Sequence, residues 1–278
     1  MMKNSKNSLL LVDPEFDPNT APDCNLLLKI TRDSFSYAII NKNSKKLKAI
    51  FDQQECDDIK ASLELALKQD VYLSLPFREI KVSAFTLNTI SIPDELYELQ
   101  DLNSYANFFT EEQADILYTQ PVATFGFTSI FNLQQFIQDT LDKHLSAAKR
   151  YEQNAPTLAL ATAKRGSSLL LDFTAGSFHA LLLKDGKVIF QNTLPIDNPE
   201  EFNYYLLLLI QELQVDMENT EVLMSGIIHE HDGYHTCLRQ YFNYTFFNPP
   251  PADDTDLAIL DDMPAHYYSS LLALDLCV

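Results

Sequence analysis

The chain has 278 residues, of which 46% are apolar, so it is long enough for two ordinary domains and too apolar for a disordered protein. Its 20 basic and 39 acidic residues give a net charge of −19, which argues against nucleic acid or an anionic membrane as partner, since both require clustered lysine and arginine. No segment approaches the roughly 18 consecutive apolar residues that a membrane span needs. The acidic surface fits a role in keeping the protein soluble, and a basic protein is a compatible partner.

Residues 1–24 are polar and include Pro14, Pro18 and Pro22, which predicts an N-terminal arm and no folded element. The apolar cluster 9–12 is too short for the core of a signal peptide, so we expect a cytoplasmic protein. The cysteines agree with a reducing compartment, because they are scattered and fit neither a zinc knuckle nor a disulfide framework. They are Cys24, Cys56, Cys237 and Cys277.

The first half of the chain predicts three strands followed by a helix. Residues 26–30 and 35–40 are rich in β-formers, and apolar residues alternate with polar ones over 47–51. Asp57 and Asp58 suit the first turn of a helix, where a negative charge meets the helix dipole. The apolar face of that helix consists of Ile59, Leu63, Ala66 and Leu67.

The second half predicts the same order. Strands are expected at 169–173, 178–183 and 188–190, and Pro199 opens a helix whose first turn carries two glutamates. The expected elements after that helix are a strand at 222–224, a helix within 230–242, a strand at 244–247 and a closing helix at 264–276.

An internal repeat relates the two halves. Residues 26–43 align without a gap to residues 169–186, and six of the eighteen pairs are identical: three leucines, Thr31/Thr174, Ser34/Ser177 and Phe35/Phe178. One long offset of 143 residues predicts two similar domains in tandem, with no array of short repeats. We therefore expect a first domain over 25–150 and a second over 151–278.

Three antiparallel strands, a helix, a strand, a helix and a strand resemble the ribonuclease H-like fold, and two tandem copies resemble the actin-like ATPase architecture, with mixed sheets flanked by helices. The segment 169–192, beginning Leu-Leu-Leu-Asp-Phe-Thr-Ala-Gly-Ser, is similar to the second phosphate hairpin of actin-like ATPases, most of all to the pilus-assembly branch. With 203–207 and 266–277, the chain resembles an uncharacterised bacterial family over roughly residues 25–278. The resemblance implies a fold and no assigned activity.

Actin-like ATPases hold phosphates between two glycine-bearing hairpins, one in each domain, and an acidic residue near each hairpin positions the metal and the water. The resemblance therefore implies candidate ligand residues in each half. The first 125 residues hold no glycine, and a lysine stands where the second copy has an aspartate. The candidates are Lys29, Thr31 and Arg32 in the first half, and Asp172, Gly176, Ser177 and Gly226 in the second.

Because the nucleotide site is incomplete, we expect a non-catalytic binding or scaffold protein with an unidentified protein partner and no cofactor. The alternative is a sensor or weak ATPase that binds ATP with magnesium, or another phosphorylated ligand, between the two hairpins. Lys29 and Arg32 favour this alternative, because they bring positive charge to an acidic molecule.

Two further chemistries have weak support. A ribonuclease H-type nuclease needs several convergent carboxylates, and Asp172 alone is well placed for that role. His229, His231 and His235 form the one histidine cluster, in which the last two are spaced for a shared helical face as zinc ligands often are. The third ligand is unspecified, so no metal site is predicted, and these histidines remain a weak candidate.

Overall fold

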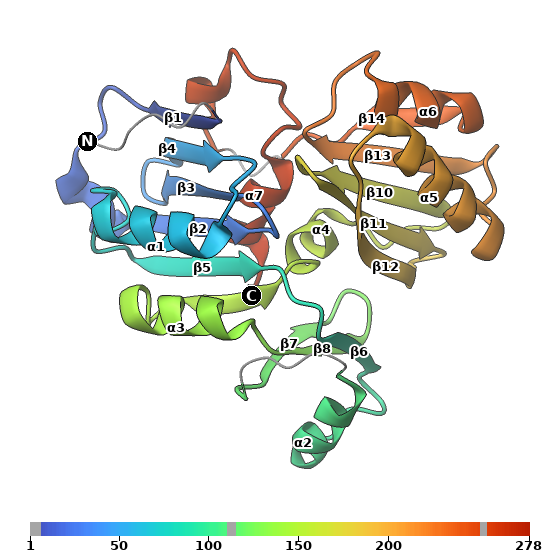
Figure 1. The fold of residues 1–278 in the computed structure, drawn as a ribbon, viewed down its shortest axis with the longest axis horizontal. Coiled ribbons are helices and arrows are strands. Elements are labelled where there is room, and N and C mark those ends of the chain that lie inside the picture. The colour runs from blue at the N-terminus through green and yellow to red at the C-terminus, as the bar shows by residue number, and fades with distance from the viewer. Residues whose placement is uncertain (1–6, 110–114, 251–254) are drawn as a thin grey trace. The chain divides into compact units, whose positions relative to one another are not determined.

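The computed structural model describes residues 7–109, 115–250 and 255–278 (Figure 1). These residues form two compact units. The first holds the described residues up to 155 together with 255–259, and the second holds the remaining described residues. Each unit contains a mixed sheet of its own, and two helices of each unit pack against that sheet.

The sheet of the first unit has six strands in the order β1-β4-β3-β2-β5-β9. Strands β1 to β4 pair antiparallel, and β5 and β9 continue the sheet in parallel with β2. The central strand β2 is an almost continuous apolar run because the sheet is covered on both faces at this strand. The bounds are β1 Ser8–Val12, β2 Cys24–Ile30, β3 Phe35–Asn41, β4 Lys46–Gln53, β5 Glu79–Ala84 and β9 Lys149–Glu152.

Two helices pack against one face of this sheet. Helix α1 (Ile59–Gln69) begins at Asp58, whose carboxylate accepts a hydrogen bond from the Ala61 N–H at 3.0 Å, so one of the two expected aspartates is the N-cap. Helix α3 (Gln135–His144) lies beside α1. Their apolar residues meet the even-numbered side chains of β2 in one core, which includes Leu26, Leu28, Leu63, Leu67, Ile137 and Leu141.

The second unit repeats this arrangement with five strands in the order β12-β11-β10-β13-β14. Helices α5 and α6 pack on one face, where Phe173, Phe178 and Phe202 form an aromatic cluster at the centre of the core. The bounds are β10 Ser167–Phe173, β11 Ser177–Lys184, β12 Lys187–Pro195, α5 Pro199–Glu212, β13 Thr220–Gly226, α6 Gly233–Tyr241 and β14 Tyr244–Phe247.

Strand order and register confirm the internal repeat. In both units the strands of the repeat follow the spatial order third, second, first, fourth and fifth, and in the first unit β1 adds one more strand outside the third. The pairs also correspond, because Leu26 faces Ile39 in the first unit and Leu169 faces Leu182 in the second. The predicted order of three antiparallel strands, helix, strand, helix and strand is therefore confirmed in both halves.

A third sheet was not anticipated from the sequence. It lies between β5 and α3, has the order β6-β8-β7 and is antiparallel throughout. The second unit has only residues 227–232 between the corresponding strand and helix. The inserted elements are β6 Thr89–Pro93, η2 Leu99–Asp101, α2 Leu102–Tyr105, η3 Ala106–Phe108, β7 Tyr118–Val122 and β8 Phe127–Phe131.

The expectation of an N-terminal arm is wrong for the described part of that segment, and residues 1–6 lie outside the described residues. Strand β1 pairs antiparallel with β4, and a 3-10 helix, η1 (Pro18–Asp23), follows it. The prolines that argued against structure lie outside β1, and two of them lie in η1, where the Asp17 carboxylate caps the first turn. Proline tolerates the start of a helix, so its presence did not exclude order.

Domain limits and the C-terminus also differ from expectation. The units divide at 155/156, within the short helix α4 (Ala155–Leu160), and residues 255–259 belong with the first unit. There the Leu47 N–H donates to the Asp256 carbonyl at 2.9 Å. The closing helix is limited to α7 (Ser269–Ala273) and η5 (Leu274–Leu276), and η4 (Ala258–Leu260) precedes it. In the described part of the chain, no helix has both the length and the apolarity to cross a membrane.

Candidate functional site

The turn between β2 and β3 carries the candidate residues of the first unit, and its own hydroxyl groups close it. The Thr31 N–H donates to the Ser34 carbonyl at 2.9 Å, and the Ser34 N–H donates to Thr31 Oγ1 at 3.0 Å. The two hydroxyl oxygens are 2.6 Å apart. This hairpin therefore turns without glycine, because the Thr31 hydroxyl oxygen accepts the Ser34 amide hydrogen and so stabilises the turn.

The turn between β10 and β11 has the same construction. The Thr174 N–H donates to the Ser177 carbonyl at 2.8 Å, and the two hydroxyl oxygens are also 2.8 Å apart. The threonine and the serine of this Thr-x-x-Ser pattern are identical in the two copies of the repeat. In each copy their hydroxyl groups form hydrogen bonds that close the turn. Thr31 and Ser177, which the resemblance implied as ligand residues, thus have a structural role that accounts for their presence in both copies.

Asp172 is a buried carboxylate near the end of β10, with 3% of its surface exposed. Its Oδ1 accepts a hydrogen bond from the Ser225 hydroxyl of the neighbouring strand β13 at 2.8 Å. Lys29 occupies the equivalent place in β2, beside Ser83 of β5, and is only half-buried. The two units therefore present opposite charges at matching positions of matching sheets.

Gly226 ends β13 and touches the backbone of β10. Its φ is +79°, and a Cβ built there would lie 2.0 Å from the Phe173 carbonyl oxygen. Its N–H donates to the His266 carbonyl at 3.0 Å, and the next amide, of Ile227, donates to the Phe173 carbonyl at 2.9 Å. The close approach of β13 to β10 thus requires a glycine at this position. The amide hydrogen of Gly226 is already bonded to the His266 carbonyl oxygen.

The other two candidates differ in their surroundings. Gly176 accepts a hydrogen bond from the Ile196 N–H through its carbonyl oxygen at 3.1 Å. Arg32 is exposed at the tip of the first hairpin, and its guanidinium carbon lies 5.6 Å from the centre of the Phe85 ring. This separation is within the range of a cation–π contact.

The structure thus groups the seven candidates by unit. Lys29, Thr31 and Arg32 share one hairpin of the first unit. The other four lie at one end of the second sheet, where β10 and β13 both finish and Phe173 pairs with Gly226. Ligands of mixed α/β sheets bind at the carboxyl ends of parallel strands, so each group lies where a ligand of its own unit would be expected.

The histidine cluster does not have the predicted geometry. His231 has a φ of +70° and precedes α6, so it does not share a helical face with His235. Its N–H donates to His235 Nδ1 at 3.0 Å. Asp232 caps the helix by accepting from the His235 N–H and, through its other oxygen, from the His229 N–H, both at 2.8 Å. These contacts belong to a helix start, and burial lowers the pKa of His235.

Gly233 is the first residue of α6. A Cβ at Gly233 would lie 2.4 Å from Pro199 Cγ, so a close contact with α5 accounts for the glycine. Among the described residues, no group of three or more histidine, cysteine, aspartate and glutamate side chains is placed to hold a metal ion.

Sequence analysis missed a fully buried glutamate at the end of β9. Glu152 Oε2 accepts a hydrogen bond from the Asn154 N–H at 2.8 Å, and Oε1 has no partner. Burial raises the pKa of the Glu152 carboxyl to about 8. The residue lies in a short stretch of mixed polarity, Lys-Arg-Tyr-Glu, and no sequence pattern distinguishes it from a surface glutamate.

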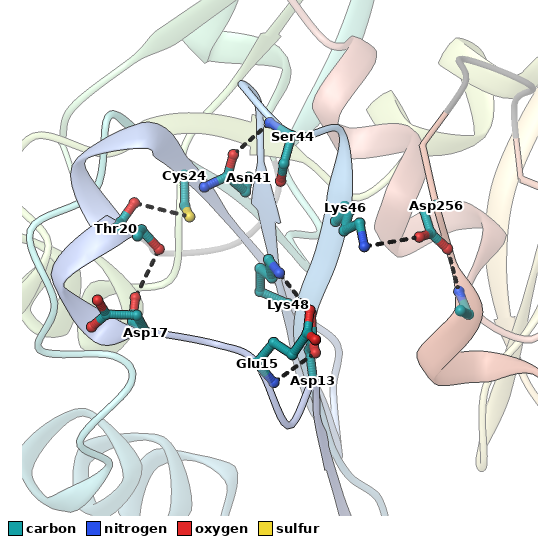
Figure 2. A network of polar contacts seen from close by, with 11 residues as sticks. Asp13, Glu15, Asp17, Thr20, Cys24, Asn41, Ser44, Lys46, Lys48 and Asp256 are labelled. Atoms are coloured by element: carbon teal, nitrogen blue, oxygen red, sulfur yellow. Dashed lines mark hydrogen bonds and ion pairs between the residues drawn. The ribbon is translucent and has the colours of Figure 1, made fainter.

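A second polar network joins β4 to the segment that follows β1 and to residues 255–259 (Figure 2). Lys48 Nζ lies 2.6 Å from Asp13 Oδ2, with both side chains largely buried, and Lys46 pairs with Asp256 at 3.6 Å. An open cavity of about 280 Å³ lies beside these pairs. It is slightly smaller than the usual small-molecule site of about 300–1,000 Å³, and the lysine that lines it, Lys46, is paired with Asp256, so we interpret the network as structural.

Comparisons with known proteins agree with this architecture. The family described as "Protein of unknown function (DUF3822)" matches residues 13–244. A Bacteroides thetaiotaomicron protein with an actin-like ATPase fold and unknown function superposes with a TM-score of 0.72 at 15% identity, over 88% of this chain and 96% of that chain. A chain of the PilM–PilN type IV pilus biogenesis complex superposes with a TM-score of 0.63, also at 15% identity, over 91% and 97%. No curated protein matches the sequence.

At this level of identity the likeness establishes the fold. The chain has the actin-like ATPase fold, with mixed sheets flanked by helices, as the order of its elements predicted. Fold by itself assigns no activity.

Proposed function

The chain belongs to the DUF3822 family of proteins of unknown function, and from this premise we propose that it is a non-catalytic protein-binding or scaffold protein on a degenerate actin-like ATPase fold. One observation carries the proposal. In the second unit, two groups that a nucleotide site would need are hydrogen-bonded within the chain: the Asp172 carboxylate to Ser225, and the Gly226 N–H to the His266 carbonyl.

This engagement matters because phosphate binding depends on backbone amides that point at the ligand and are otherwise unpaired. To offer its amide to a ligand, Gly226 would have to lose the bond to His266, a net loss of about 1 kcal/mol for a typical hydrogen bond. The first unit supports the same conclusion. Lys29 there stands where the second unit has a carboxylate, and an ammonium group cannot bind magnesium.

The proposed partner is a protein. One of the similar structures is a complex named PilM–PilN, which is compatible with protein binding by a chain of this fold. The formal charge of −19 favours a basic partner surface. We also infer a reducing compartment, the cytoplasm, because Cys24, Cys56, Cys237 and Cys277 are all free thiols.

The test is a thermal-shift screen of the whole chain with ATP, ADP, GTP and phosphorylated metabolites, with and without magnesium, together with an ATPase assay. We expect flat melting curves and no turnover. A ligand at one hundred times its Kd adds about 2.7 kcal/mol to stability, so even moderate affinity would raise the melting temperature measurably. Magnesium-dependent turnover that Asp172→Asn abolishes would contradict the proposal.

The second candidate function is a sensor that binds a phosphorylated ligand, and the exposed Arg32 guanidinium favours it. In this case the same screen would show a saturable rise in melting temperature that Lys29→Ala or Arg32→Ala removes. Lys184→Ala is a suitable control, because Lys184 is also exposed but lies at the far end of the second sheet's hairpin β11–β12.

A further inference from the structure

Helix α5 carries apolar side chains on two opposite faces. Phe202, Leu206 and Leu209 pack into the core of the second unit. On the other face, Tyr204 is 63% exposed, and Leu207 and Leu208 are each 42% exposed. A helix at the surface of a sheet normally has a polar outer face, so the outward side chains of α5 are those of a helix covered on both sides.

The exposed residues form an ordered row. Glu200, Tyr204, Leu208 and Glu212 follow one another at intervals of four, and Leu207 lies alongside them. Residues four apart are neighbours on a helix surface, so the row is a continuous ridge with an acid at each end and an apolar centre. At 1.5 Å per residue the two acids are about 18 Å apart along the axis.

The outward leucines are not needed to form the helix. Pro199 occupies the first turn, Asn198 accepts a hydrogen bond from the Glu201 N–H at 2.9 Å, and Glu201 in turn accepts from the Asp197 N–H at 2.8 Å. This reciprocal capping specifies where α5 starts. Glutamine or lysine at 204, 207 and 208 would keep the helix propensity without exposing apolar surface, so packing inside the unit does not explain these residues.

The charge around the ridge indicates what covers it. Glu200 and Glu201 lie in its first turn, and Glu212, Asp216 and Glu218 lie at or beyond its last turn, all of them exposed. From Val188 to the C-terminus, the sole basic residue is Arg239, on the outer side of α6. A second copy of the chain is a poor occupant, because antiparallel pairing of two α5 helices would set Glu200 of each against Glu212 of the other.

We propose that the outer ridge of α5, comprising Glu200, Tyr204, Leu207, Leu208 and Glu212, docks an amphipathic helix of a partner protein. The partner helix has apolar residues at its centre and a lysine or arginine towards each end. These two basic residues are about 12 residues apart, to match the acids at the ends of the ridge. Apolar burial at the centre supplies the affinity, and the two charged ends determine register and orientation. This inference rests on the proposed function and specifies the surface and the class of partner.

The test uses a synthetic amphipathic peptide of about 18 residues, which is five helical turns, with central leucines and flanking lysines. Two control peptides replace the lysines with glutamates or scramble the sequence. Binding to the whole chain is measured by fluorescence anisotropy. We expect the lysine peptide to bind saturably and neither control peptide to bind. Salt should weaken the binding, because it screens the charged ends. Leu208→Glu should reduce the affinity about tenfold or more, as expected for a central interface residue.

Two further variants make the result specific to the ridge. Leu65→Glu on α1 is the matched control, since Leu65 is an exposed helical leucine (46%) in the other unit, and its affinity should equal that of the wild type. The double change Glu200→Lys with Glu212→Lys should weaken the lysine peptide and create binding of the glutamate peptide. Circular dichroism melts of each variant show that it is folded.

Three outcomes would overturn this proposal: no binding of the lysine peptide, equal loss of binding with Leu65→Glu and Leu208→Glu, or a dimer in sedimentation velocity that Leu208→Glu dissociates. None of them touches the proposed function, which fails only if nucleotide stabilises the chain or is hydrolysed. The two failures are therefore distinguishable in the same protein preparation.

Discussion

Ser225 donates its hydroxyl hydrogen to the Asp172 carboxylate over 2.8 Å, between two neighbouring parallel strands of the second unit. The corresponding pair in the first unit is Ser83 and Lys29. The serine persists in both copies while its partner has changed from an acid to a base. In the first unit the serine hydroxyl instead donates to the Glu152 carbonyl, at 3.3 Å. The repeat has thus kept its backbone pairing and changed the charge at the end of its central strand.

The repeat offers a matched test of that contact. Ser225→Ala removes a donor from a buried carboxylate, so we expect it to lower the free energy of unfolding by about 1–3 kcal/mol. Ser83→Ala removes a long hydrogen bond to a neutral carbonyl, and its effect should be smaller. Urea denaturation of both variants measures the difference, and equal effects would show that the Asp172 contact has no special weight.

A comparison of alanine substitutions at Gly226 and Gly126 distinguishes the cost of steric crowding from the cost of backbone strain. Both have a positive φ, +79° and +70°, but a Cβ at Gly226 would strike the Phe173 carbonyl, whereas a Cβ at Gly126 would meet no atom within 4 Å. Gly126→Ala should cost about 1 kcal/mol, the price of a left-handed conformation for alanine. Gly226→Ala should cost several times more and lower soluble expression. Similar melting temperatures for the two variants would contradict the close approach of β13 to β10.

Glu152 predicts an unusual dependence of stability on pH. Burial raises the pKa of its carboxyl to about 8 from an ordinary value of 4.5. Between these values the unfolded chain has released a proton that the folded chain keeps. The contribution of Glu152 is therefore fully present below pH 4.5, is lost as pH rises towards 8, and stays constant above it.

Comparison with Glu152→Gln isolates this effect, because glutamine is uncharged at every pH and all other titrating groups are shared. The free energy of unfolding of the wild type should fall relative to the variant by about 1.4 kcal/mol per pH unit within that window. Denaturant titrations at intervals from pH 5 to 9 measure it. Parallel curves for the two proteins would mean that Glu152 is ionised in the folded state.

The Lys48–Asp13 pair attaches the segment after β1 to the sheet (Figure 2). Lys48 lowers the pKa of the Asp13 carboxyl through a hydrogen bond to it. Removing one partner leaves a charge in a largely buried place, so Asp13→Asn and Lys48→Met should each lower the melting temperature by a few degrees. The double variant should lose less than the sum, with a coupling energy of about 1 kcal/mol.

The exposed pair Lys68–Glu64 on α1 is the control for this cycle, since it has an N–O distance of 3.0 Å but lies in solvent. We expect no measurable coupling there, because water and salt screen exposed pairs. If the two cycles gave the same result, the burial of Asp13 and Lys48 would have no energetic consequence.

Local patterns were sufficient for the elements that build both sheets. The leucine runs of β2 and β10, the helix start at Asp58 and the helix opened by Pro199 were all recognisable, because each depends on residues close in sequence. The 143-residue offset then predicted two copies of one fold, which the matching strand orders confirm. The inserted sheet was missed because each of its strands has only five residues, and two of them, β6 and β7, are partly exposed and end at or near a proline, so their patterns are too short to indicate a strand.

The sequence by itself determined the repeat, the charge, the order of the elements and the loss of glycine and carboxylate from the first hairpin. Only the tertiary structure decided that β1 joins the sheet and that residues 255–259 belong to the first unit. The same holds for the hydrogen bond from the Gly226 N–H to the His266 carbonyl and for the burial of Glu152. The physical reason is the range of the interactions. Capping and periodicity act over a few residues, whereas strand pairing, desolvation and close backbone contact join residues far apart in the chain.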